Sequence, residues 1–149
     1  MTYLEAVNKV LRRLREDEVV SVSSNPYSKL IGELVNDAKR LVEDAWDWSS
    51  LRTTLTVNTT AGVFSYNLVG SGTGIKTLDV INETSNVFME QTPASWMNNV
   101  FLNQSPPESS PSYYAWNGFN DDGYAVVDIY PIPDTVYILR FNVVNRDAE

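Results

Sequence analysis

Residues 41–58 read LVEDAWDWSSLRTTLTVN, and the period of their apolar side chains changes in the middle of the segment. Up to Trp48 the apolar residues keep the spacing of an α-helix, whereas Leu55 and Val57 alternate with polar neighbours as in a half-buried strand. The change therefore predicts a helical part in residues 1–49 and a strand-rich part in residues 50–149. The length of 149 residues indicates that both belong to a single domain, residues 1–149.

The helical part holds two predicted helices. Thr2 and Glu5 have the spacing of a capping box at the start of the first helix. Asn25-Pro26 supplies an N-cap and a first-turn proline for the second, whose apolar stripe continues to Ala45. At 1.5 Å per residue a helix of this length is roughly 30 Å long, which is typical of a packing or assembly spine. The apolar stripe of the first helix consists of Leu4, Val7, Leu11 and Leu14.

The strand-rich part predicts about seven short strands separated by turns. Residues 54–68 predict a hairpin, residues 75–81 and 87–90 predict two further strands, and residues 94–102 predict a short helix. A second hairpin is expected from residues 113–116 and 125–130, and a last strand from residues 137–143. The proline-containing segment 103–112 is expected to be an extended, solvated loop. The fold class is therefore α+β, with two N-terminal helices packed against an antiparallel β-sandwich or barrel.

The composition excludes most catalytic chemistry. The chain has no Cys and no His. It therefore lacks a disulfide framework, a thiolate zinc site, a cysteine nucleophile and the usual general base. We expect a protein that is not an enzyme and that holds no metal or cofactor.

Two motifs invite a functional interpretation and favour a structural one. Gly70-Ser71-Gly72-Thr73-Gly74 could cradle a phosphate, but a phosphate loop opens a helix, and the residues that follow are strand-like. Asn120-Asp121-Asp122-Gly123 could begin a calcium loop, but no bidentate Glu follows at the required position. A plain connection and a hairpin turn are the favoured interpretations.

The acidic balance of the chain argues against sequence-specific nucleic-acid binding. Eleven basic and 19 acidic residues give 11 − 19 = −8. Residues 1–49 carry 7 − 9 = −2 and residues 50–149 carry 4 − 10 = −6, so the strand-rich part is the acidic pole. No N-terminal targeting signal and no apolar run of about 20 residues is present, so we expect no membrane association and assembly in a cytosol.

Aromatic residues leave a second function open. Tyr113, Tyr114 and Trp116 occupy both faces of one predicted strand, so some of them should be exposed. They could stack on sugars in a carbohydrate-binding β-sandwich module, or they could anchor a protein interface.

The order of the elements resembles one family, the head-to-tail adaptor (connector) subunits of tailed bacteriophages, in particular the tail-tubular-protein-A-like adaptors. The resemblance covers nearly the whole chain. The matching features are the N-terminal helix, the long helix ending in Ala45-Trp46-Asp47-Trp48, the strands Thr53–Thr59 and Phe64-Ser65-Tyr66-Asn67-Leu68, and the close Val127-Asp128-Ile129-Tyr130-Pro131-Ile132-Pro133-Asp134 followed by Tyr137-Ile138-Leu139-Arg140-Phe141.

The resemblance implies a structural protein of the virion. Members form a ring, usually of twelve copies, between the portal protein and the tail or nozzle protein, and DNA passes through without sequence-specific binding. The helices are expected on the portal side and the β-region outward or toward the tail. Family members continue into a further C-terminal helix, so a helical segment is expected to be lacking after Arg146-Asp147-Ala148-Glu149. Another tail-completion or baseplate protein is the alternative within the virion.

Two sets of residues are candidates for the contacts of such a subunit, because their positions predict exposure. The polar face of the long helix is the candidate subunit interface. The proline-containing loop and the second hairpin are the candidate contacts on the tail side. The interface set is Lys29, Glu33, Asp37, Lys39 and Arg40, and the tail-side set is Pro106, Pro107, Pro111, Phe119, Asp121 and Asp122.

Overall fold

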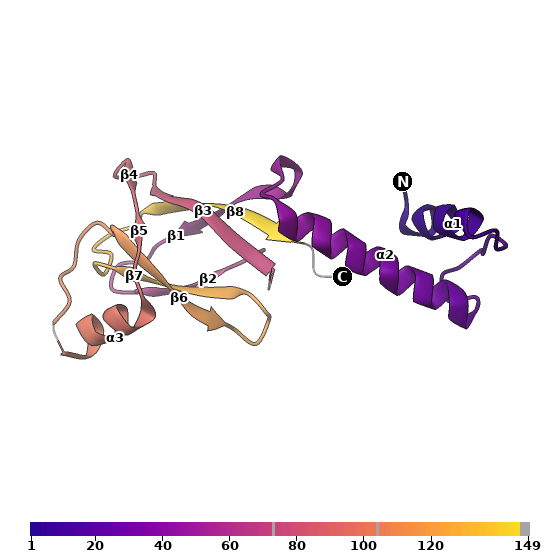
Figure 1. Ribbon diagram of the computed structural model, residues 1–149. Helices are drawn as coiled ribbons and strands as arrows, with labels where there is room; N and C mark the ends of the chain where they lie inside the picture. The colour runs from indigo at the N-terminus through magenta and orange to yellow at the C-terminus, as the bar shows by residue number, and fades with distance from the viewer. Residues whose placement is uncertain (73, 104, 147–149) are drawn as a thin grey trace. The chain divides into compact units, whose positions relative to one another are not determined.

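The computed structural model describes residues 1–72, 74–103 and 105–146 and confirms an α+β fold (Figure 1). The chain divides into two compact units, residues 1–47 and 48–149, which we name the helical unit and the sandwich unit. Each has a hydrophobic core of its own. Whether the two fold as one domain stays a prediction.

The helical unit is a pair of helices, α1 (Tyr3–Arg13) and α2 (Pro26–Ala45). Both predicted N-terminal caps are confirmed. The Glu5 amide donates to the Thr2 hydroxyl at 3.3 Å, and the Thr2 amide donates to the Glu5 carboxylate at 2.7 Å. The Ser28 amide donates to Asn25 Oδ1 at 2.7 Å, which caps α2 in the same way. These side chains satisfy amides that have no partner within the helix.

Close packing of α1 against α2 depends on a glycine. Val7, Leu11 and Ile31 form the buried core of this unit. A Cβ atom on Gly32 would lie 2.5 Å from the Tyr3 hydroxyl oxygen and 2.6 Å from Val22 Cγ1, so only glycine fits without a shift of these neighbours. The connection between the helices is a loop, and Asn8 holds it through two hydrogen bonds of 2.9 Å with the backbone of residue 19.

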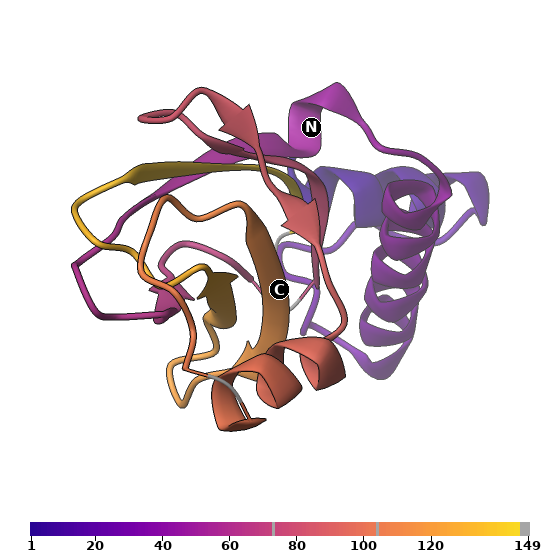
Figure 2. The same cartoon turned by 90° about the vertical axis from the view of Figure 1, so that its left-hand side faces the viewer.

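Over its described residues, 48–72, 74–103 and 105–146, the sandwich unit consists of two four-stranded sheets. A 3₁₀ turn, η1 (Ser49–Leu51), leads into the first. The first sheet has the order β1 (Arg52–Asn58), β8 (Ile138–Arg146), β3 (Gly74–Asn82), β4 (Val87–Phe88). The second has the order β2 (Ser65–Leu68), β7 (Ala125–Tyr130), β6 (Tyr113–Phe119), β5 (Glu90–Gln91). All pairs are antiparallel except β5–β6, and α3 (Ala94–Asn103) packs on β6 (Figure 2).

Two strand expectations are wrong. Residues 54–68 do not form a hairpin, because β1 pairs with β8 in one sheet and β2 pairs with β7 in the other. Residues 87–90 are not one strand, because β4 and β5 belong to different sheets and the buried Met89 lies between them. Alternation identifies the buried face of a strand correctly, but it contains no information on which strand is the partner.

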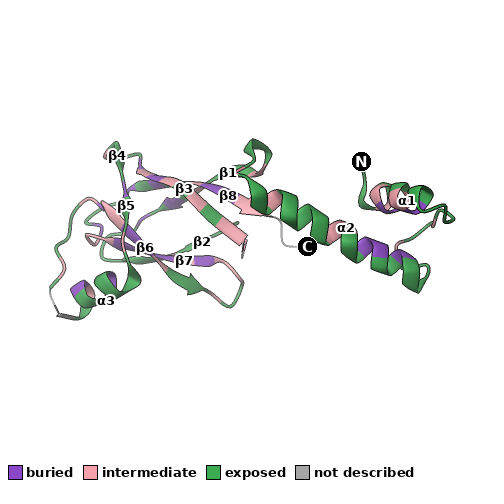
Figure 3. Cartoon of the chain, in the orientation of Figure 1, coloured by how far each residue is buried: buried purple, intermediate pink, exposed green. Residues whose placement is uncertain are grey.

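The core of the sandwich unit follows the predicted alternation. Leu139, Phe141 and Val143 of β8 are fully buried and belong to the same core cluster as Val127 and Ile129 of β7. Figure 3 shows β7 and β8 with stretches in the colour of buried residues. The predictions of the second hairpin (β6 and β7), the short helix (α3) and the last strand (β8) are confirmed.

The sandwich has two ends, which we define by their loops. At the proximal end the chain enters from residue 48, and the loops 69–72 and 120–124 meet the end of β8. Ser71 Oγ accepts from the Ala125 amide at 2.8 Å, and Asn145 Oδ1 accepts from the Gly72 amide at 3.1 Å. The distal end holds the loops 59–64, 83–86, 105–112 and 131–137.

Candidate assembly surfaces

The predicted interface residues all lie on the exposed surface of α2. Lys29, Glu33, Asp37, Lys39 and Arg40 are exposed, and at about 100° per residue they span an arc of about 160°. Lys39 Nζ lies 3.7 Å from Glu43 Oε1, one turn further along the helix. The helical period thus brings the set onto one side of the helix.

A second surface of α2 is apolar, and the sequence analysis did not single it out. Leu30, Leu34 and Leu41 are 49%, 55% and 72% exposed as residues, although the stripe pattern predicts burial. At about 100° per residue the three leucines lie about 60–100° around the helix axis from Ile31, the α2 residue that packs in the core with Val7 and Leu11 of α1. No local sequence signal separates them from the buried part of the stripe. Figure 3 shows the second half of α2 largely in the colour of exposed residues.

The proline-containing loop at the distal end is bound to its neighbours rather than freely solvated. The Ser109 amide donates to the Ile132 carbonyl at 2.9 Å, and the Ile132 amide donates to the Pro107 carbonyl at 3.1 Å. Pro107 is exposed, Pro106 is half-buried and Pro111 is buried. The expectation of a solvated loop is therefore wrong for Pro111, and residue 104 of the predicted segment lies outside the described residues.

A buried asparagine that sequence reasoning missed anchors this loop. Asn82 is fully buried at the end of β3. Its Nδ2 donates to Ser110 Oγ at 3.1 Å and to the Pro111 carbonyl at 3.2 Å. Its Oδ1 accepts from the Ser85 amide at 3.2 Å. One side chain therefore connects two distal loops, and a lone Asn at the end of an apolar strand was the only sequence signal.

A threonine and a tyrosine connect the other two distal loops. Thr59 Oγ1 accepts from the Tyr137 amide at 2.7 Å and donates to the Thr135 carbonyl at 3.1 Å. The Tyr137 hydroxyl donates to Asp134 Oδ1 at 2.7 Å, and this hydrogen bond raises the pKa of Tyr137. The distal end is thus a cross-linked surface, which can hold a fixed shape against a partner.

The second predicted tail-side element is a tight turn at the proximal end. The Gly123 amide donates to the Asn120 carbonyl at 3.0 Å, and Gly123 has φ of +81°, a conformation that favours glycine. Phe119 is 52% exposed as a residue, and Asp121 and Asp122 are exposed. This turn follows β6 and the proline-containing loop precedes it, so seven strand residues separate them by roughly 20 Å. The structure does not bring the two tail-side candidates together.

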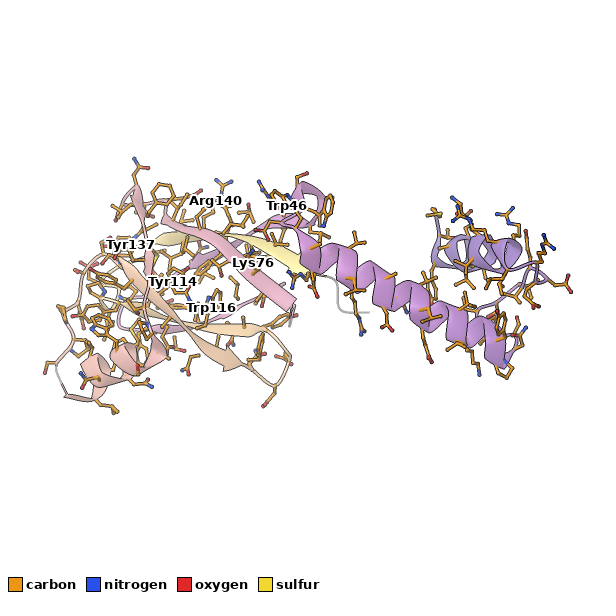
Figure 4. All side chains as sticks on the ribbon, viewed as in Figure 1. Trp46, Lys76, Tyr114, Trp116, Tyr137 and Arg140 are labelled. Atoms are coloured by element: carbon orange, nitrogen blue, oxygen red, sulfur yellow. The ribbon has the colours of Figure 1, made fainter. Side chains whose placement is uncertain are left out.

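The aromatic residues considered for sugar stacking do not form an exposed platform. Tyr114 and Trp116 point into the sandwich core, where their rings lie 6.1 Å and 6.0 Å from that of Phe141 (Figure 4). Tyr113 lies on the opposite face, against Trp96 of α3 at 5.7 Å between ring centroids. The expected distribution over both faces is confirmed, but the expectation that some of these residues are exposed is wrong. Tyr114 is buried and Tyr113 and Trp116 are half-buried, because Tyr113 packs against α3 and the other two pack in the core.

The structure also tests the candidate phosphate loop, the candidate metal site and the expectation about a membrane span. The residue after Gly74 continues a strand, not a helix, and Thr73 lies outside the described residues. Within residues 1–72, 74–103 and 105–146 no group of three or more acidic ligands could hold a metal ion. Over the same ranges no helix is both long and apolar enough to cross a membrane.

A family model described as SU10 adaptor protein matches residues 1–148. No curated protein matches the sequence.

Proposed function

The chain belongs to the SU10 adaptor protein family of structural bacteriophage proteins, and on this basis we propose that its copies form a ring between the portal and the tail. The match over residues 1–148 is the observation that carries the proposal. The family is not an enzyme family, so the function proposed for the chain is to bind other proteins.

In the proposed ring each copy presents different surfaces to different partners. A ring in which every copy contacts the next by the same pair of patches requires two distinct patches on one subunit. The polar face of α2 is the candidate for neighbouring copies. The portal protein and the tail or nozzle protein are the other partners, and twelve is the copy number that the resemblance implies.

The charge of the chain supports passage of DNA through such a ring. The net charge is −8, and the strand-rich part carries −6 of it. An acidic lining repels phosphates, so DNA would slide through without being held. The location that follows is the virion neck, with assembly in the host cytoplasm.

The two tail-side elements now have different roles in the proposal. We assign the tail contact to the distal loop with Pro106 and Pro107, because hydrogen bonds to Ile132 and Asn82 hold that loop in a fixed shape. The Phe119–Gly123 turn lies at the opposite end of β6, so one flat partner cannot contact both.

The experiment is assembly of the full chain, alone and with purified portal rings of the same phage. Negative-stain electron microscopy and mass photometry should show closed rings, free or seated on the portal. A chain that stays monomeric under both conditions contradicts the proposed function. Replacing Glu108 by Lys beside Pro107 should weaken attachment of the tail protein and leave ring formation unchanged, and Asp122→Lys at the proximal end is the matched control.

A further inference from the structure

The leucine stripe of α2 lacks a cover within the helical unit. We define it as Leu30, Leu34 and Leu41, which lie within about 40° of one another at 100° per residue. The buried apolar core of the helical unit has three residues, Val7, Leu11 and Ile31. A unit of 47 residues with so small a core ordinarily needs an additional source of stability, such as association with another chain.

The helical unit has a second apolar surface, a groove that is bordered by two basic residues. We name it the α1 groove. It has a volume of about 270 Å³ and is lined by Met1, Ala6, Lys9, Val10, Arg13 and Val35. Lys9 and Arg13 are the charged and exposed members of this lining, and we name these two its rim. A cavity of about 150 Å³ already accommodates a benzene-sized group, so the groove has room for the end of a leucine side chain.

The charges beside the stripe complement the rim of the groove. On α2, Asp37 lies about 20° and Glu33 about 60° from Leu30 around the helix axis. Lys9 and Arg13 are exposed on α1. Within residues 1–72, 74–103 and 105–146, none of these four side chains makes an ion pair. The leucine stripe therefore has an acidic border, and the α1 groove has a basic border. The two surfaces consist of different residues of the helical unit.

We propose that the leucine stripe of one copy packs into the α1 groove of the next copy, with Glu33 and Asp37 facing Lys9 and Arg13. The contact joins two different patches, so it repeats from copy to copy and can close a ring. This inference rests on the proposed function, because it assumes self-assembly. It assigns the contact to an apolar strip and its acidic border rather than to the whole polar face of α2.

Cysteine cross-linking tests the pairing directly, because the chain has no Cys of its own. Val10→Cys and Leu34→Cys are made in separate full-length chains, which are mixed and oxidised where the wild type assembles. The mixture should give a disulfide-linked dimer at about tenfold the yield of either variant alone. A chain with both substitutions should give a ladder of multimers.

The matched control uses the same helix. Lys39→Cys lies about 140° from Leu34 around the axis, so its mixture with Val10→Cys should give the background yield. Equal yields from the two mixtures overturn the inference, and so does a dimer formed by Leu34→Cys alone as efficiently as by the mixture. Failure of the stripe to cross-link because the sandwich unit of the same chain covers it also overturns the inference.

A charge exchange provides an independent readout that does not alter the groove floor. One variant carries Lys9→Glu and Arg13→Glu, and a second carries Glu33→Lys and Asp37→Lys. Each alone should lose self-association by about tenfold or more, and an equimolar mixture should regain it, as sedimentation velocity measures. Variants that assemble like the wild type contradict this inference alone. A wild type that assembles neither alone nor on portal rings contradicts the proposed function as well.

Discussion

The helical unit and the sandwich unit differ in how much apolar surface each buries within itself. The sandwich unit has an extended core across two sheets, with Phe141, Leu139 and Val143 fully buried. The helical unit buries three core residues and leaves three leucines of α2 at least 49% exposed. The difference indicates that the sandwich supplies its own stability, whereas the helical unit is stabilised by what it contacts. We therefore expect substitutions to act differently in the two units.

The largest effect should come from the sandwich core. Phe141→Ala removes a ring that contacts both Tyr114 and Trp116, and it should cost about 3–5 kcal/mol of the free energy of unfolding. Urea denaturation of the full chain, followed by tryptophan fluorescence, measures the loss. Phe119→Ala, at a 52% exposed position, is the control and should cost far less. If Phe141→Ala and Phe119→Ala lost the same free energy of unfolding, the sandwich core would not be the source of the stability of this unit.

A smaller and more local effect should follow from a larger side chain between the helices. Gly32→Val forces Tyr3 and Val22 away from α2, at a cost of about 1–3 kcal/mol. Hydrogen exchange should quicken in α1 and α2 and stay unchanged in β7 and β8. Lys39→Val, exposed on the same helix, separates the effect of crowding from that of a branched side chain. Faster exchange in β8 would mean that the two units unfold together.

The smallest effect concerns alkaline pH and the sandwich unit. The hydrogen bond from the Tyr137 hydroxyl to Asp134 raises the pKa of Tyr137, and burial raises the pKa of Tyr66 and of Tyr114. The pKa values of these hydroxyls are higher in the folded than in the unfolded chain, so folding favours their protonated form. The corresponding stability is complete below about pH 10 and is lost as the pH rises through the folded-state values.

Urea midpoints at about pH 8 and about pH 11 measure this loss. Tyr137→Phe should reduce the difference between the two midpoints, because one of the three titrating hydroxyls is removed. An unchanged difference would show that the hydrogen bond to Asp134 does not hold the proton in the folded chain.

The helices could be predicted almost to the residue, because their signals are local. Asn25-Pro26 marks the start of α2, and the end of its stripe at Ala45 marks the end. Alternation likewise identified the buried face of β8 through Leu139, Phe141 and Val143. Strand partners could not be predicted, because the residues of β1 pair with residues of β8 that lie 80 to 92 positions further along the chain, and only packing of the whole sandwich selects that pairing.

The candidate surfaces could be predicted in part. The polar face of α2 follows from the helical period alone, and its residues are exposed as expected. The exposure of Leu34 and Leu41 could not be seen in the sequence, because an apolar stripe indicates a contact without saying whether the partner is in the same chain. The burial of Pro111 depends on Asn82, 29 residues away, and no local pattern reports such a contact.

Hydrogen exchange of the full chain at two protein concentrations tests the central claim most directly. The claim is that association of copies stabilises the helical unit, while the sandwich unit is stable by itself. Amides of α2 should gain protection as the protein concentration rises, and those of β7 and β8 should show the same protection at both concentrations. Protection in α2 that does not depend on concentration would contradict the claim.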